Sequence, residues 1–389
     1  MIDETRIRKN LELISFPRLS GTEGEKRAFN IVKKKIEDLN LKPSVQEFTF
    51  TTFYPRIYQK LIFILSFWTL FIFYLNIGEA FGIFNVLNSI IIIAILIPIV
   101  IITRKPEKIR IGKEKNSQNL YVKILGNSEV KSLKNSSHEQ DNVRGNLLFV
   151  CHLDSKGQRF HMNFRVFLFK WWIVSSICCF ILIFFKNFIF KQFSFWFFIV
   201  GAIPLIFNLI IVILLCINTT TNESKGAIDN ASGISCVLEL LNYYTDLKNR
   251  LDNYNLWFLF TGCEENGTMG IRHFIQKLKH LDQTKSFQLN FDTIGTNIDI
   301  ITGERGAFFF KNTKGFTVTI HMVKRIRLAR SDAYILKDNN ITGFGVLDME
   351  SYKYVHSKDD TVEKVDCSLL EKLLTHITVM LKLMDHTNL

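Results

Sequence analysis

The sequence contains little cysteine and no Cys-x-x-Cys pair. Its seven cysteines are an odd number, and three of them lie inside long apolar runs. This distribution argues against a disulfide framework. A signal-peptide pattern is also missing, because the first residues include Asp3, Glu4 and Glu12 and no long apolar stretch. We therefore expect the first apolar run, further along the chain, to serve as the targeting signal.

Nucleic-acid-binding motifs are absent as well, although the formal net charge is +12. Some basic residues gather at Lys324–Arg327 and Arg330, but most of the excess positive charge lies beside the apolar runs. Positive charge in that position is attracted to anionic lipid headgroups. We therefore expect the lipid bilayer, and not a nucleic acid, to be the partner of these basic residues.

Four long apolar runs are the main feature that is present. The chain is 48% hydrophobic and has 36 phenylalanines, although it also carries 48 basic and 36 acidic residues. A helix needs about 20 apolar residues to cross the hydrocarbon core of a bilayer. The runs that approach this length are Leu61–Ile77, Phe81–Ile102, Val166–Phe185 and Phe193–Ile217. One short run could be a buried core helix, but four of them predict four transmembrane helices in two hairpins.

The charges that flank the hairpins predict their orientation. Basic residues are frequent where the chain enters and leaves each hairpin: Arg56, Lys60, Arg104, Lys105, Lys108, Arg110, Lys156, Arg159, Arg165 and Lys225. The far side carries only Lys186 and Lys191. Because positive loops tend to stay in the cytoplasm, we expect an integral membrane protein whose other segments are cytoplasmic.

Outside the apolar runs, the sequence alternates helix and strand patterns. Thr22 and Glu25 form a capping-box pattern before an amphipathic helix. Further strand and helix patterns follow at Val45–Phe53, Asn119–Leu125, Asn146–Cys151, Asn255–Phe260, Gly267–Leu278, Phe287–Phe291 and Leu369–Leu383. Lys113–Asn142 is polar and partly Ser/Asn-rich, which predicts a mobile excursion between strands.

These patterns predict an α/β fold with a mixed central sheet flanked by helices. Continuous apolar strands such as Asn146–Cys151 are typical of the buried middle of a sheet. We expect residues 1–56, 109–157 and 221–389 to form this α/β domain. Residues 57–108 and 158–220 are expected to be the two transmembrane hairpins inserted into it.

Acids and histidines follow several of the predicted strands. Glu264 and Glu265 stand side by side after an apolar run, and one member of such a pair can bind a metal while the other moves protons. The other candidates are His152, Asp154, Asp229, Asp292 and His356. Nitrogen and oxygen donors of this kind suit zinc, with manganese or cobalt as second choices. Each residue alone could instead be a turn or cap residue, and Asp229 could be the N-cap of the following helix.

In their order along the chain, these motifs resemble the M28 metallopeptidases, a family of zinc aminopeptidases. The resemblance begins at Arg18-Leu-Ser-Gly-Thr22 and ends in the segment Val355–Thr361. Ser331-Asp332 and Gly343–Val346 look like a late helix and strand of the family. The resemblance therefore covers nearly all of the chain outside the apolar runs.

This resemblance implies a site with two zinc ions. Asp229 would bridge the two ions. His152 and Asp292 would complete the ligands of one ion, and Glu265 and His356 would complete those of the other. Cys151 and Cys263 precede site residues directly, but small buried residues at strand ends are expected there, so we leave both out of the ligand set.

The resemblance also implies roles for two residues that do not bind the metals. Glu264 would be the general base that takes a proton from water and later gives it to the leaving amine. Asp154 would hydrogen-bond the far ring nitrogen of His152 and so fix the tautomer of this imidazole.

The function implied is peptide hydrolysis at the membrane, most simply by an aminopeptidase acting on a peptide substrate. M28-like folds also include glutaminyl cyclases, so cyclase-like acyl transfer is an alternative. A second alternative is a catalytically inactive membrane scaffold, binding protein or transporter-like module. Pairing of the hairpins between copies would give a homo-oligomer.

Overall fold

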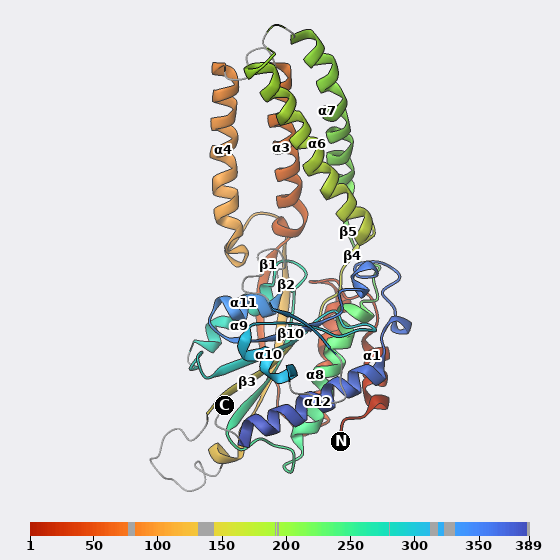
Figure 1. Cartoon of the computed structure of the whole chain (residues 1–389). Helices are drawn as coiled ribbons and strands as arrows, with labels where there is room; N and C mark the ends of the chain where they lie inside the picture. The colour runs from red at the N-terminus through yellow and green to blue at the C-terminus, as the bar shows by residue number, and fades with distance from the viewer. Residues whose placement is uncertain are drawn as a thin grey trace. The chain divides into compact units, whose positions relative to one another are not determined.

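Eight strands form one mixed sheet in the computed structural model (Figure 1). In sequence order they are β1 (Ser44–Thr51), β2 (Glu114–Ile124), β3 (Gly145–His152), β6 (Tyr254–Thr261), β7 (Ser286–Phe291), β8 (Asp299–Thr302), β9 (Thr319–Met322) and β10 (Thr342–Leu347). Their order across the sheet is β1-β2-β6-β3-β7-β10-β8-β9. The four central strands, β6, β3, β7 and β10, are mutually parallel. Their carboxyl ends therefore share one edge of the sheet.

The expected α/β fold with a mixed central sheet is confirmed. Every residue of β3 and β7 is buried, as their near-continuous apolar sequences predict for strands covered on both faces. One expectation about this part of the chain was wrong. Lys113–Asn142 is not wholly an excursion, because β2 already begins at Glu114 and pairs antiparallel with β6. Residues 131–142 of that segment lie outside the described residues.

Helices cover both faces of the sheet. The larger core packs β3, β6 and β7 against α1 (Glu4–Ile14), α2 (Glu23–Glu37), α8 (Ser232–Thr245) and α12 (Cys367–His386). The opposite face packs against α9 (Met269–Leu278) and α11 (Asp332–Asp338). A short helix, α10 (Glu304–Lys311), contacts β10. Figure 1 shows α1, α8 and α12 gathered together on their side of the sheet.

The structure describes residues 1–76, 82–130, 144–190, 192, 194–279, 281–311, 318–322 and 331–386. The chain divides into two units. Unit 1 comprises Met1–Phe50, Lys115–Gly157 and Thr221–Leu389, and contains nearly all of the sheet. Unit 2 comprises Thr51–Glu114 and Gln158–Thr220. Two very short strands, β4 (Gly157–Gln158) and β5 (Thr220–Thr221), pair where the chain passes between the units.

Four helices make up most of unit 2. They are α3 (Gln59–Leu75), α4 (Ile83–Thr103), α6 (Met162–Phe188) and α7 (Ser194–Ile217). All four are long and apolar enough to span a membrane, judged by length and composition. Parts of the two predicted turns, and the span ends Ile77, Phe81 and Phe193, lie outside the described residues.

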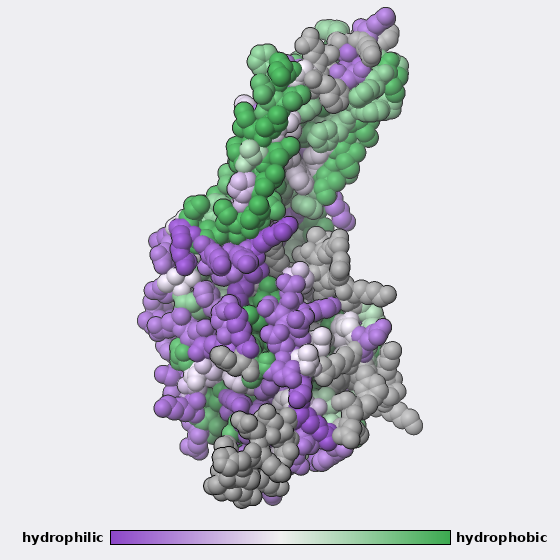
Figure 2. All heavy atoms as spheres, turned by 90° about the vertical axis from the view of Figure 1, so that its left-hand side faces the viewer, coloured by the Kyte–Doolittle hydropathy of each residue, from purple (hydrophilic) through white to green (hydrophobic). Residues whose placement is uncertain are grey.

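The outward surface of these helices is apolar, and their few polar contacts face one another. Figure 2 shows hydrophobic residues along the visible face of unit 2. Ile90 on α4 and Ile203 on α7 are 56% and 70% exposed, which is unusual for large apolar side chains in water. Inside the bundle, the amide of Asn208 donates to Ser175 Oγ at 2.7 Å and to Ser176 Oγ at 3.0 Å. The neighbouring helix α6 thus satisfies the NH2 group of this polar residue in the fourth run.

Candidate metal centre

The candidate site lies at the carboxyl edge of the parallel strands in unit 1. His152 is the last residue of β3, and Asp292 directly follows β7. In the register of the sheet, His152 pairs with Thr261 at the end of β6, and Glu264 follows three residues later. Adjacent parallel strands therefore deliver all three side chains to one place, as open α/β sheets do at their binding edges.

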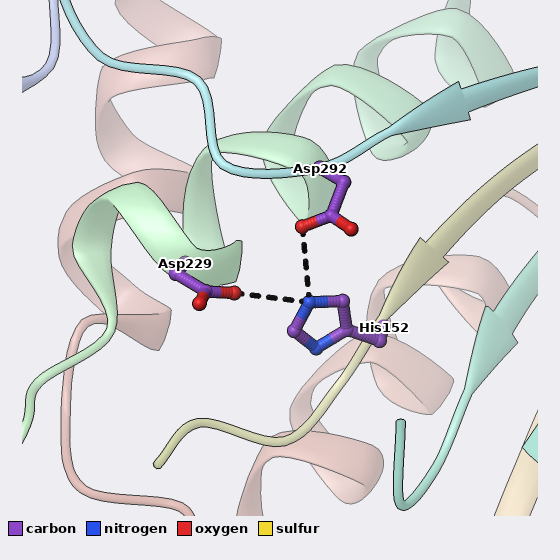
Figure 3. Close-up of side chains that lie close together, drawn as sticks. All are labelled: His152, Asp229 and Asp292. Carbon is purple, nitrogen blue, oxygen red and sulfur yellow. Dashed lines mark hydrogen bonds and ion pairs between the residues drawn. The ribbon is translucent and has the colours of Figure 1, made fainter. Parts of the chain in front are cut away.

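His152, Asp229 and Asp292 form the first group of potential metal ligands. Figure 3 shows the His152 imidazole pointing between the two carboxylates. Its Nε2 lies 3.0 Å from Asp229 Oδ1 and 3.3 Å from Asp292 Oδ1. One donor atom from each of the three residues lies within 4.8 Å of the others.

Asp229, Glu265 and His356 form the second group, under the same distance criterion. The Nε2 of His356 lies 2.7 Å from Glu265 Oε1 and 3.4 Å from Asp229 Oδ2. Asp229 thus presents one carboxylate oxygen to each imidazole. On the outer side of this group, Lys156 Nζ lies 3.5 Å from Glu265 Oε2.

The loop that carries Asp229 is held by buried polar contacts. The Asp360 carboxylate accepts the Ile228 amide at 2.6 Å, and the Asn230 side chain donates to Phe291 O at 2.9 Å. Helix α8 begins only at Ser232, after Asp229. The alternative that Asp229 is an ordinary helix N-cap was therefore wrong, because Ala231 occupies that position.

Arg18 fixes the same loop from behind. Its side chain is fully buried and donates to the carbonyl oxygens of Leu153, Lys225 and Gly226 at 2.7–2.8 Å. These contacts join the segment before α2 to the loops on both sides of the site. Burial lowers the pKa of the Arg18 guanidinium to about 10, which still leaves it charged at neutral pH.

Asp154 organises the turn that carries the two glutamates. Its Oδ1 accepts the Glu264 amide at 3.0 Å and its Oδ2 accepts the Glu265 amide at 3.1 Å. Ser20 Oγ also donates to Oδ2, at 2.5 Å. The Nδ1 of His152 lies 3.1 Å from the backbone carbonyl of Asp154 and 3.4 Å from its carboxylate. Asp154 therefore contacts the imidazole and also fixes the backbone of the Glu264 turn.

Glu25 supports the same turn, although its sequence pattern predicted something else. In a capping box Thr22 and Glu25 would bond to each other's backbone amides. Instead Thr22 makes no side-chain cap bond, and Glu25 accepts from Gly21 N at 2.6 Å and from Cys263 N at 3.0 Å. Burial raises the pKa of the Glu25 carboxyl to about 8. The capping-box interpretation was thus wrong. The Glu25 carboxylate instead accepts a hydrogen bond from the backbone of Cys263, the residue before Glu264.

We expect Asp154→Asn to lower kcat/KM about 10- to 100-fold, the usual range for residues that orient ligands. An asparagine amide would turn an NH2 group toward at least one of the backbone N–H groups that the carboxylate now accepts. Peptide hydrolysis and bound zinc should be measured on the same sample. Ser20→Ala, which removes only one of the donors, should have a smaller effect. An unchanged kcat/KM in folded Asp154→Asn would show that this support is dispensable.

The electrostatics of the group separate Glu264 from its neighbours. Burial raises the pKa of the Glu264 carboxyl well above its usual range. Burial also opposes charge on Asp229 and His152, but their mutual hydrogen bonds outweigh it. These bonds hold the pKa of Asp229 well below its usual range and raise the pKa of His152. Glu264 belongs to neither ligand group and is 8% exposed.

A cavity of about 180 Å³ adjoins the site. Asp292 and Tyr352 are among its walls, together with Phe344 and Leu347 of β10. Near it, Asp332 belongs to neither ligand group. Its carboxylate accepts from Thr261 Oγ1, and burial raises the pKa of this carboxyl to about 7.

Every member of the two groups could therefore be named from the sequence, but the residues that support them could not. Arg18, Ser20, Asp332 and Asp360 were quoted only as parts of motifs, and Glu25 only as a capping-box residue. Each acts through contacts with residues far away in the sequence, such as the 238 positions between Glu25 and Cys263. The local signals were the short motifs that contain Arg18, Ser20, Asp332 and Asp360.

Comparison with known proteins agrees with this geometry. Residues 217–380 match the model of Peptidase family M28. This segment of the chain is similar to an M28 peptidase domain. The matched segment of this domain includes Asp229, Glu264, Glu265, Asp292 and His356, whereas His152 precedes it. No curated protein matches the chain.

Solved structures resemble the chain over almost its full length. An aminopeptidase from Aneurinibacillus sp. strain AM-1 is 12% identical, with a TM-score of 0.57 over 98% of this chain and 93% of that one. A zinc aminopeptidase from Bacillus subtilis is 12% identical, with a TM-score of 0.55 over 98% and 95%. A glutaminyl cyclase from Fimbriiglobus ruber is 14% identical, with a TM-score of 0.51 over 98% and 95%. At such identities the likeness establishes the fold alone.

Proposed function

We propose that the chain is a membrane-embedded peptidase with two zinc ions, which removes N-terminal residues from peptides. The observation that carries this proposal is the sharing of Asp229 by two groups of metal-ligand residues. A carboxylate with one oxygen turned to each of two imidazoles has the arrangement of a bridging ligand. A turn or cap residue has no reason to face two histidines in this way.

The donor atoms in each group fit zinc. Each group offers one imidazole nitrogen and two carboxylates, and zinc binds nitrogen and oxygen donors in sets of three or four. Three protein ligands leave a further position for water or substrate, which is typical of catalytic sites. When bound, two zinc ions would acidify a water molecule and polarise the scissile carbonyl.

The surrounding residues supply proton transfer and positioning. Glu264, outside both groups, is placed to take a proton from water and to pass it to the leaving amine. Asp154 holds the Glu264 backbone, and Glu25 holds the residue before it. Lys156 brings a positive charge to the outer side of Glu265. The chain thus provides a general base on a turn fixed from two sides.

Peptide hydrolysis is preferred to cyclisation because of the second ligand group. Both groups are complete here, and a second ion has a clear use in stabilising the attacking and leaving atoms during hydrolysis. The two aminopeptidases among the similar structures support removal of N-terminal residues. The similar glutaminyl cyclase makes cyclisation the second candidate.

An assay on three peptides separates these possibilities. The full chain in detergent should bind two zinc ions and release the first residue from a peptide with a free N-terminus, but not from its N-acetylated form. A chelator should abolish this release and added zinc should restore it. A cyclase would instead convert an N-terminal glutamine peptide with loss of ammonia and leave the other peptides intact. A scaffold would turn over none of the peptides, and either result would reject the proposal.

Membrane embedding is the second part of the proposal. It is supported by the four apolar helices and by their exposed apolar side chains. Because each hairpin crosses twice, every segment of unit 1 emerges on one side, which we assign to the cytoplasm from the flanking positive charges. Resistance of the chain to alkaline carbonate extraction, together with protease protection in sealed vesicles, tests this assignment.

A further inference from the structure

Unit 2 contains a cavity that the peptidase proposal does not use. Its volume is about 680 Å³, within the range of about 300–1,000 Å³ that is typical of small-ligand sites. It is lined by the first turns of α3 and α6, by the end of α7 and by the residues that follow α7. These are the helix ends that would lie at one surface of a membrane.

The charged side chains among the described residues that line this cavity are all basic. Arg56, Lys60, Arg165 and Lys170 line it, and none of the described lining residues is an aspartate or glutamate. Four cations without a carboxylate among the lining residues favour an anionic ligand. Lipid phosphates are the most abundant anions at the level where such helix ends meet a bilayer.

The rest of the wall is apolar on the same helix faces. On α6, Arg165 and Phe169 are four residues apart, as are Val166 and Lys170, so cations and apolar groups share one face. Phe63 on α3 packs edge-on against Trp172, with ring centroids 5.1 Å apart. A small soluble anion would leave this apolar wall unused, whereas the first part of an acyl chain would cover it.

Two buried polar atoms belong to residues in the wall and lack partners among the described residues. They are the indole Nε1 of Trp172, which can only donate, and the side-chain Oε1 of Gln158, which accepts. Unsatisfied buried groups of this kind are rare in native structures and call for a ligand or water. Both atoms are closed off from solvent, so a side-chain rotation would turn the Trp172 donor to a phosphate oxygen and the Gln158 acceptor to a headgroup hydroxyl.

We propose that this cavity binds the headgroup of an anionic glycerophospholipid, with phosphate held by its cations and Trp172 and the acyl chain against Phe63 and Phe169. The proposal rests on the membrane embedding put forward above, but not on peptidase activity. Such a lipid would join the bases of the two hairpins, because α3 belongs to the first and α6 and α7 to the second.

Native mass spectrometry of the delipidated full chain tests the proposal. Short-chain phosphatidylglycerol should bind more tightly than phosphatidylcholine with the same acyl chains. Arg165→Gln with Lys170→Gln should weaken phosphatidylglycerol binding about 10- to 30-fold, since each cation near a lipid surface contributes about 1 kcal/mol. The matched control is Lys105→Gln with Lys108→Gln, which removes the same charge from exposed positions of unit 2 outside the cavity.

A milder single substitution keeps the proposal testable if the double variant fails to fold. Trp172→Phe keeps an aromatic ring but removes the donor, and should weaken phosphatidylglycerol binding about 5- to 10-fold. Equal weakening by cavity and control variants would mean general surface attraction and would overturn the proposal. Displacement of the lipid by inorganic phosphate would also overturn it, because the site would then take the free anion.

Carbonate extraction of the same variants tests membrane embedding separately from the lipid site. If the unmodified chain is washed from membranes, embedding itself fails, whatever the lipid affinity in detergent. If the chain stays in membranes but phosphatidylglycerol shows no preference for the intact cavity, only the lipid site is rejected.

Discussion

Glu264→Gln is expected to lower kcat by about 10²- to 10⁴-fold, the usual contribution of a general base, while bound zinc stays at the level of the unchanged protein. The Glu264 side chain is outside both ligand groups, so its replacement removes no proposed metal ligand. Glutamine has nearly the same shape as glutamate, and the substitution leaves intact the backbone N–H of residue 264 that donates to Asp154 Oδ1. The substitution removes only the ability to take up a proton.

Zinc content and turnover must be measured on the same preparation of this variant. Glu37→Gln is a suitable control, because it makes the same chemical change on α2 at a side chain that is 51% exposed. The control should leave both quantities unchanged. If the variant lost zinc together with activity, Glu264 would be a metal ligand and not the general base. If the variant kept full activity, Glu264 would have no role in proton transfer.

The five proposed ligands could be named from the sequence because the fold delivers most of them by a simple rule. His152 and Asp292 end or directly follow buried apolar strands, and Glu264 and Glu265 come after a third. Apolar runs of this kind are recognisable without a structure, and parallel strands place their last residues and the loops beyond them at one edge. The interpretation of that edge as a two-metal site came from resemblance, not from the strands themselves.

The residues that hydrogen-bond the loops of the site could not be predicted from the sequence, for a physical reason. Glu25 has the spacing of a capping box, and only the tertiary structure shows that its carboxylate turns to Gly21 and Cys263. Arg18 reaches three carbonyl oxygens, from residues up to 208 positions away. Backbone carbonyl and amide groups are the same in nearly every residue. A side chain that hydrogen-bonds to them therefore cannot be recognised from the sequence around it.

The parts of the fold that were missed are short or polar. Strands β8 and β9 have four residues each, and helix α1 has charged residues over much of its length. Short strands carry too little alternation to stand out from turns. Helix α1 is held by tertiary contacts such as the ion pair between Arg6 and buried Glu239, at 2.7 Å. By contrast, the four apolar helices were recognisable because each extends over about five or more turns of apolar residues.

Asp229→Ala should have the largest effect of any single substitution, because it removes a donor from both ligand groups at once. Asp229 turns Oδ1 to His152 and Oδ2 to His356, so each group would keep only two donors. We expect bound zinc to fall from two ions to one or none per chain. We expect kcat/KM to fall by at least about 10³-fold, since metal ions at such sites contribute several kcal/mol to the transition state.

A second measurement distinguishes loss of metal from loss of folding in this variant. Ligands that bind only the folded state raise Tm, so added zinc should raise the Tm of the unchanged protein but not that of Asp229→Ala. Asp338→Asn, an acid at an exposed position of α11, is the control and should keep the zinc-dependent rise. If Asp229→Ala still bound two zinc ions, the carboxylate would not be the bridge, and the two groups would be separate sites. If it bound one ion and kept its activity, a single group would suffice for the chemistry and the preference for hydrolysis by two ions would be lost.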